Sequence, residues 1–167
     1  MSRAHGNSSN GGLDVLAGFK WFLPARLAGS ARPGLLDELA NDLEFLASQG
    51  LTRIVSLTRT PIELPAEEAR FEVVHLAIPD MGIPTPRACA QLCRALCSDL
   101  DTRPTLLHCK GGLGRTGLIA ACCLVTLGEP ADAALAAVRS INPNFVQTVA
   151  QERFISHYAA WLEAGEG

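Results

Sequence analysis

The sequence predicts a single α/β domain with a central, mainly parallel sheet flanked by helices. Its 167 residues match the size of about one domain. Hydrophobic residues make up 48% of the chain, which is enough to fill a core and excludes a wholly disordered protein. Short segments with strand character alternate with longer segments of helical spacing, and this alternation favours an α/β layer arrangement.

The strand candidates are short and are separated by turn-forming residues. Residues 19–32 mix aromatic residues with Leu, Pro and Gly and predict short strands and turns. Residues 53–57, 71–76 and 105–109 predict three further strands. A loop with three prolines, residues 78–86, follows the second of these.

The helix candidates rest on apolar spacing and on capping residues. Leu35 to Leu46 have helical spacing, and Gly50 ends this helix. Thr85-Pro86 predicts a helix start, because a hydroxyl N-cap precedes a proline at the first helical position. That helix should reach about Leu100. Three more helices are expected at residues 116–127, 130–141 and 146–164.

Charge and composition exclude several protein classes. Fourteen basic and 17 acidic residues give a formal net charge of -3, which argues against a protein that coats nucleic acid. No apolar run approaches the roughly 18 residues that span a bilayer. Residues 1–12 are polar and are expected to form a flexible tail ahead of a folded domain at 13–167. We expect a cytoplasmic protein with reduced thiols.

Residues 108–117, His-Cys-Lys-Gly-Gly-Leu-Gly-Arg-Thr-Gly, combine reactive and anion-binding side chains. Glycines let the backbone curl with its N–H groups pointing inward, and the following helix adds its positive end. The Arg115 guanidinium can pair with two phosphate oxygens. We therefore predict a phosphate-binding loop, and its residues are Lys110, Gly111, Gly112, Leu113, Gly114 and Arg115.

The same donors favour the thiolate form of Cys109, which would make it a nucleophile beside the bound phosphoryl group. The Thr116 hydroxyl can donate to this sulfur and stabilise it as a leaving group. A Cys at a strand end is more often inert packing, and a Gly-rich run alone is weak evidence. This loop differs from dinucleotide and nucleotide loops because Cys109 leads it and Arg115 closes it.

At these residues the chain resembles the protein tyrosine phosphatase superfamily, whose loop reads His-Cys, five residues, Arg, then Ser or Thr. It is most similar to the compact dual-specificity branch, particularly the kinase-associated phosphatase and Cdc14-like groups. The resemblance implies the cysteine-phosphatase fold and two-step phosphomonoester hydrolysis through a phosphocysteine, with no metal and no cofactor. It also implies that His108 supports the loop by hydrogen bonding.

This mechanism needs a general acid. Asp80 lies in the Pro-rich loop, one helix and one strand before Cys109, in an order similar to the acid loop of the family. The alternative is that Asp80 only forms a turn between Pro and Gly. Asp99 and Asp101 are weaker candidates at a helix end.

A second resemblance lies in Gln147-Thr148-Val149-Ala150-Gln151. Related phosphatases have a Gln-Thr-x-x-Gln loop that positions the water for hydrolysis of the phosphoenzyme. By this likeness Gln147 and Gln151 orient the water while Asp80 acts as the base. The competing interpretation is a helix N-terminus with two exposed amides.

The other five cysteines have two interpretations. Cys89, Cys93 and Cys97 recur every four residues, but they lack the usual spacing of a zinc site. Burial on the core face is the preferred interpretation, and it extends to Cys122 and Cys123. One of the five could form a disulfide with Cys109 under oxidation, although the sequence does not choose which.

The resemblance implies that the substrate is a phosphorylated protein, with phosphotyrosine and phosphoserine or phosphothreonine both accepted in a shallow pocket. Lys110 adds a cation, whereas Leu113 stands where phosphoinositide phosphatases carry a second Lys. The alternatives are a phosphatase for phosphoinositides or other small phosphate esters, a non-catalytic phospho-binding module, and a rhodanese-like sulfur carrier. Neither nucleic acid nor a membrane span is expected, and the oligomeric state is left open.

Overall fold

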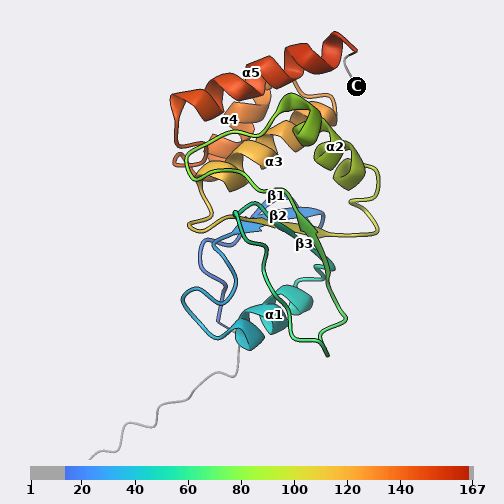
Figure 1. Cartoon of the computed structure of the whole chain (residues 1–167), viewed down its shortest axis with the longest axis vertical. Helices are drawn as coiled ribbons and strands as arrows, with labels where there is room; N and C mark the ends of the chain where they lie inside the picture. The colour runs from blue at the N-terminus through green and yellow to red at the C-terminus, as the bar shows by residue number, and fades with distance from the viewer. Residues whose placement is uncertain (1–13, 166–167) are drawn as a thin grey trace, which may run out of the picture.

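The computed structural model describes residues 14–165, which form five strands and five helices (Figure 1). The strands are β1 (Lys20–Leu23), β2 (Leu27–Ser30), β3 (Arg53–Ser56), β4 (Glu72–His75) and β5 (Thr105–His108). The helices are α1 (Leu39–Ser48), α2 (Pro86–Cys97), α3 (Gly114–Thr126), α4 (Ala131–Ile141) and α5 (Val149–Glu163). The tail predicted at residues 1–12 lies outside the described residues.

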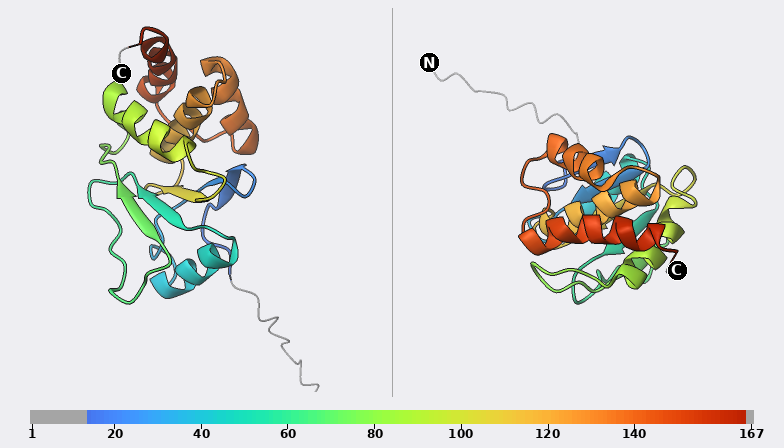
Figure 2. Two further views of the ribbon diagram at one scale, coloured as in Figure 1. Left: turned by 90° about the vertical axis from the view of Figure 1, so that its right-hand side faces the viewer. Right: turned by 90° about the horizontal axis from the view of Figure 1, so that it is seen from above.

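The strands form one mixed sheet in the order β1-β2-β5-β3-β4. Only the β1–β2 pair is antiparallel among the described strands, and the other three pairs are parallel. Helix α1 covers one face of the sheet, whereas α2 to α5 cover the other (Figures 1 and 2). The prediction of an α/β domain with a mainly parallel sheet is confirmed.

Two hydrophobic cores follow from the alternation of side chains along the central strands. Ile54 and Leu106 point into the smaller core beneath α1. Their neighbours Val55 and Leu107 point into the larger core beneath α2 to α5. All four side chains have 0% exposure, so both faces of the central strands are covered.

Two helices begin three or four residues later than the sequence predicts. The helix expected from Leu35 begins at Leu39, and the preceding Leu36 is 79% exposed. Gly34 has a φ of 81° and lies in a turn, which the apolar spacing did not reveal. The last helix begins at Val149 instead of Val146, because Val146 has a left-handed φ of 64°. Such a residue cannot continue a right-handed helix.

Two other helix boundaries differ from the prediction by two or three residues. Helix α3 begins at Gly114, two residues before the predicted start. Helix α2 ends at Cys97 with Ser98 as its C-cap, so the segment up to Leu100 is a turn. The first difference is relevant to the site, because it places Arg115 inside the first turn of the helix.

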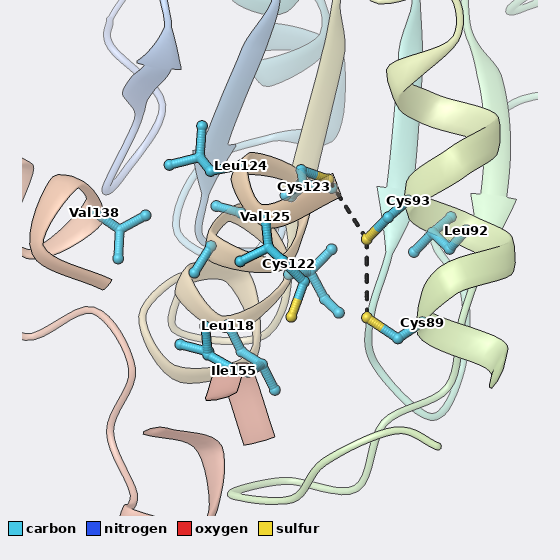
Figure 3. Close-up of a cluster of buried hydrophobic side chains, with 14 of the residues drawn as sticks. Cys89, Leu92, Cys93, Leu118, Cys122, Cys123, Leu124, Val125, Val138 and Ile155 are labelled. Carbon is cyan, nitrogen blue, oxygen red and sulfur yellow. Dashed lines mark hydrogen bonds between the residues drawn. The ribbon is translucent and has the colours of Figure 1, made fainter. Parts of the chain in front are cut away.

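Cys89, Cys93, Cys122 and Cys123 lie where α2 faces α3 (Figure 3). The Cys97 thiol at the end of α2 donates to the Cys123 carbonyl of α3 at 3.6 Å. The Cys93 sulfur is 3.8 Å from that of Cys89 and 3.8 Å from that of Cys123. Burial raises the pKa of the Cys122 thiol. Within residues 14–165, no group of three His, Cys, Asp or Glu side chains is placed to hold a metal ion. These contacts fit packing in the core and give no support to the zinc interpretation.

None of the helices between residues 14 and 165 combines the length and apolar character needed to cross a bilayer.

Candidate active site

Cys109 is the first residue after β5, at the carboxyl edge of the sheet, and is only 3% exposed. Its sulfur accepts a hydrogen bond from the Gly112 N–H at 3.2 Å and another from the Thr116 hydroxyl at 3.1 Å. Both donors can stabilise negative charge on the sulfur. Cys109 and Thr116 are therefore brought together as the sequence predicted.

The loop between β5 and α3 packs directly on the end of β2. Gly112 has a φ of 79°, and a Cβ there would lie 2.5 Å from the backbone nitrogen of Ala31. The Lys110 carbonyl accepts a hydrogen bond from the Arg32 N–H at 3.1 Å. These contacts fix the path of the loop, and Gly is needed at position 112 because any other residue would overlap β2.

The loop leads directly into the N-terminus of α3. The N-cap residue Leu113 makes no side-chain capping bond. Its carbonyl accepts from the Gly117 N–H at 2.9 Å, while Lys110 and Gly111 are exposed. Because the first-turn N–H groups of a helix carry partial positive charge, this end of α3 can bind an anion.

Arg115 joins the loop to the Pro-rich segment between β4 and α2. Its side chain is buried, and one guanidinium nitrogen donates to the Ile78 carbonyl at 3.0 Å. The other lies 3.4 Å from an oxygen of Asp80, whose side chain is 80% exposed. Asp80 thus lies at the phosphate-binding loop, with its carboxyl accessible to a bound ester.

Asp99 and Asp101 lie at the opposite edge of the sheet. Asp99 pairs with Arg53 at 2.9 Å, and Arg53 is the first residue of β3. Asp101 lies 3.7 Å from Arg26, just before β2. Four residues of β5 separate this edge from Cys109, or about 13 Å of strand. Neither carboxylate can therefore act on a group bound at Cys109.

His108 connects the loop to β3 through a chain of buried hydrogen bonds. Its Nδ1 donates to the Cys109 carbonyl at 3.1 Å, so Nε2 accepts from the Ser56 hydroxyl at 2.6 Å. The Ser56 oxygen in turn accepts from the Ile62 N–H at 2.9 Å. Burial lowers the pKa of His108 to about 4, so the imidazole is neutral near pH 7.

Ser56 is a residue that the sequence analysis missed. It lies at the end of β3, 52 positions before His108, and the two meet because β3 and β5 pair in parallel. A lone Ser at the end of a strand carries no signal by itself. The predicted order of strands could have placed it beside His108 only if their register were also known.

Gln147 and Gln151 both lie against the start of α3. A Cβ on Gly114 would lie 2.7 Å from the amide oxygen of Gln147 and 3.2 Å from that of Gln151. Gln147 is exposed, but Gln151 has 0% exposure. The interpretation of two exposed amides is therefore wrong for Gln151.

The loop at the carboxyl edge of this sheet begins with Cys109 and ends with Arg115, which is the arrangement of a cysteine-dependent phosphatase. Residues 28–129 match the family model described as "Polymorphic toxin system, DSP-PTPase phosphatase". The chain belongs to this family. The predicted resemblance to the compact dual-specificity branch is thereby confirmed.

Two relatives illustrate how much of the sequence is shared. Cyclin-dependent kinase inhibitor 3 of Rattus norvegicus is 34% identical over 94 residues, which cover 54% of this chain and 44% of the relative. Protein tyrosine phosphatase domain-containing protein 1 of Bos taurus is 28% identical over 138 residues, covering 72% and 17%. The chain spans less than half the length of these curated relatives.

Solved structures share more of the fold. Kinase-associated phosphatase, with its catalytic-site cysteine replaced by serine, has a TM-score of 0.71 and 26% identity, covering 83% of this chain and 88% of that one. Tk-PTP in its active form has a TM-score of 0.73 and 27% identity, covering 85% and 96%.

Proposed function

We propose that the protein is a phosphomonoester hydrolase of the dual-specificity type, which works through a phosphocysteine on Cys109. One observation carries the proposal. Arg115 belongs to the segment that holds the Cys109 sulfur, and a guanidinium nitrogen of Arg115 lies 3.4 Å from a carboxylate oxygen of Asp80. Nucleophile, phosphate-binding cation and acid therefore lie within the reach of one phosphate ester.

In the first step, the Cys109 sulfur attacks phosphorus and forms an S–P bond while the bond to the leaving oxygen breaks. Arg115 and the N-terminus of α3 hold the non-bridging oxygens and stabilise their charge in the transition state. Protonated Asp80 gives its proton to the leaving oxygen, so a neutral alcohol or phenol departs.

In the second step, a water molecule attacks phosphorus and the S–P bond breaks. The Asp80 carboxylate takes a proton from the water, which returns Asp80 to its acid form. The departing sulfur keeps the bonding electrons, and the Gly112 N–H and Thr116 hydroxyl stabilise it. Inorganic phosphate leaves and the site is regenerated.

Phosphoproteins are the proposed substrates, with phosphotyrosine and phosphoserine or phosphothreonine both accepted. The family membership and the phosphatase relatives support this class. Leu113 is an uncharged residue that packs against the core, so position 113 supplies no cation in addition to Lys110. A polyanionic inositol headgroup is less favoured for this reason.

The experiment is hydrolysis of phenyl phosphate, whose poor leaving group needs a proton, by the wild type and four variants. Cys109→Ser and Arg115→Lys should lose nearly all activity, and Asp80→Ala should lose about 100- to 10,000-fold while still binding phosphate. Asp101→Ala is the matched control, because this carboxylate is exposed at the opposite edge of the sheet. Its rate should stay within about twofold of wild type.

Other outcomes would favour the alternatives. Full activity in Cys109→Ser would exclude the phosphocysteine. Tight binding of a phosphopeptide without turnover by the wild type would indicate a binding module. Turnover of thiosulfate without turnover of an aryl phosphate would indicate a sulfur carrier.

A further inference from the structure

Gln151 connects the start of α5 to the loop that carries Asp80. Its side chain is buried, and its amide oxygen accepts from the N–H groups of Gln147 at 2.9 Å and Thr148 at 3.3 Å. Its amide nitrogen donates to the Gly82 carbonyl at 3.2 Å. Because the oxygen faces two donors, the nitrogen must face Gly82, so the orientation of the amide is fixed.

The loop held by this bond contains a strained turn. Gly82 N–H donates to the Pro79 carbonyl at 2.8 Å, which closes a four-residue turn with Asp80 at its second position. Met81, at the third position, has a φ of 60°, where non-glycine residues are uncommon. A strained turn persists only when surrounding contacts hold it.

Those contacts come from two sides of the turn. Arg115 donates to the Ile78 carbonyl at 3.0 Å on the side of the phosphate-binding loop. Gln151 donates to Gly82 on the side of α5, beside a longer contact of 3.5 Å from the Thr148 hydroxyl to the Met81 carbonyl. Gln151 is the buried member of the second group and also completes the capping box of α5.

We infer that Gln151 is a positioning residue for the general acid: its amide holds the Pro79–Gly82 turn so that Asp80 stays over Cys109. This inference rests on the proposed function, and it differs from the water-orienting role that the family resemblance implies for Gln151. Gln147 keeps that role, because its exposed amide lies at the start of α3.

The two roles for Gln151 predict different kinetics. Loss of acid positioning slows the first step, and it does so most for esters whose leaving group is a poor one that needs a proton. Loss of water positioning slows the second step, which is the same for every ester because the leaving group has already departed. A burst of product release then precedes slow turnover.

Gln151→Glu separates the two functions of this side chain. A Glu at the third position of the helix still accepts from the Thr148 N–H and completes a capping box. Its ionised carboxylate has no N–H to give to Gly82 and repels that carbonyl, so the bond to the turn is lost while the capping bond remains. Gln151→Asn is a second variant, whose neutral amide is too short to reach both the Thr148 N–H and the Gly82 carbonyl. It replaces Gln151→Glu in the experiment if that variant does not fold.

The matched control is Val149→Glu. Val149 is the first residue of α5 and is 65% exposed, so it receives the same new charge at the same helix end without touching the turn. The measurement is kcat for phenyl phosphate, a poor leaving group, and for p-nitrophenyl phosphate, a good one. Stopped-flow release of p-nitrophenol adds the burst measurement.

Gln151→Glu should lower kcat for phenyl phosphate by about 10- to 100-fold, lower kcat for p-nitrophenyl phosphate less than about threefold, and show no burst. Val149→Glu should keep the wild-type ratio of the two rates. Equal slowing of both esters, a burst, or unchanged kinetics in Gln151→Glu would each overturn the inference. The proposed function fails separately, if the wild type hydrolyses neither ester or if Cys109→Ser remains active.

Discussion

Replacement of Gly112 by Ala tests whether contact with β2 determines the conformation of the phosphate-binding loop. Gly112 has a φ of 79°, and an L-residue there loses about 1–2 kcal/mol. The added Cβ would also lie 2.5 Å from the Ala31 nitrogen and 2.5 Å from the Ser30 carbonyl carbon. Both are backbone atoms that cannot rotate away, so overpacking adds about 1–3 kcal/mol.

Gly112→Ala should therefore lower the free energy of unfolding by about 2–5 kcal/mol, a large share of the roughly 5–15 kcal/mol of an ordinary domain. The assay is urea unfolding followed by circular dichroism. Hydrolysis of p-nitrophenyl phosphate should fall as well, because the Gly112 N–H is one of the two donors to the Cys109 sulfur.

The neighbouring glycine provides the control. A Cβ on Gly111 would meet no atom within 4 Å, and its φ is not in the left-handed region. Gly111→Ala should therefore change the free energy of unfolding by no more than about 0.5 kcal/mol. Wild-type stability in Gly112→Ala, or an equal loss in both variants, would refute the argument that β2 contact dictates glycine at position 112.

Three further predictions follow from contacts around Cys109 and in the larger core. His108 has a pKa lowered by burial to about 4, whereas the unfolded chain binds a proton near pH 6.5. The free energy of unfolding should consequently fall by about 3 kcal/mol as the pH drops from 6.5 to 4, with little further loss from His108 below pH 4. Urea titrations of the wild type and His108→Asn should show this contribution only in the wild type. Thr116→Val should slow breakdown of the phosphocysteine by about 10- to 100-fold, because it removes the hydroxyl that donates to the departing sulfur. This variant should therefore show a burst of p-nitrophenol release, and Thr116→Ser should not. Cys93→Ala should lower the free energy of unfolding by about 1–2 kcal/mol and leave kcat/KM within about twofold, as measured by urea unfolding and ester hydrolysis.

A His108→Asn variant with the wild-type pH slope would assign the slope to another group. Equal kinetics of Thr116→Val and Thr116→Ser would show that the hydroxyl does not assist the departing sulfur. A large loss of activity in stable Cys93→Ala would mean that the cysteine cluster contributes to the site.

The phosphate-binding loop could be predicted from the sequence because its contacts are local. The donors to the Cys109 sulfur lie three and seven positions further along the chain, so one short segment contains nucleophile and donors together. Asp80 required the order of elements as well, because its loop follows β4 and reaches the site only through the parallel sheet. That order was predictable from the alternation of strands and helices.

What the sequence did not reveal depends on contacts between distant segments. Ser56 meets His108 only through the register of β3 and β5. The burial of Gln151 depends on its contact with Gly82, 69 positions earlier. The left-handed conformation of Val146 likewise belongs to a tight connection before α5, and a β-branched residue gives no local sign of it.

The glycines of the loop are explained mainly by the segments packed against them. Gly112 allows close approach of β2, and Gly114 leaves space for the amides of Gln147 and Gln151. Gly117 does the same for Phe145, whose Cβ would lie 2.8 Å from an added Cβ. An anion nest alone would require curled backbone but not these particular neighbours. The loop is thus shaped from outside by β2 and by the segment before α5, so its geometry is set before any phosphate binds.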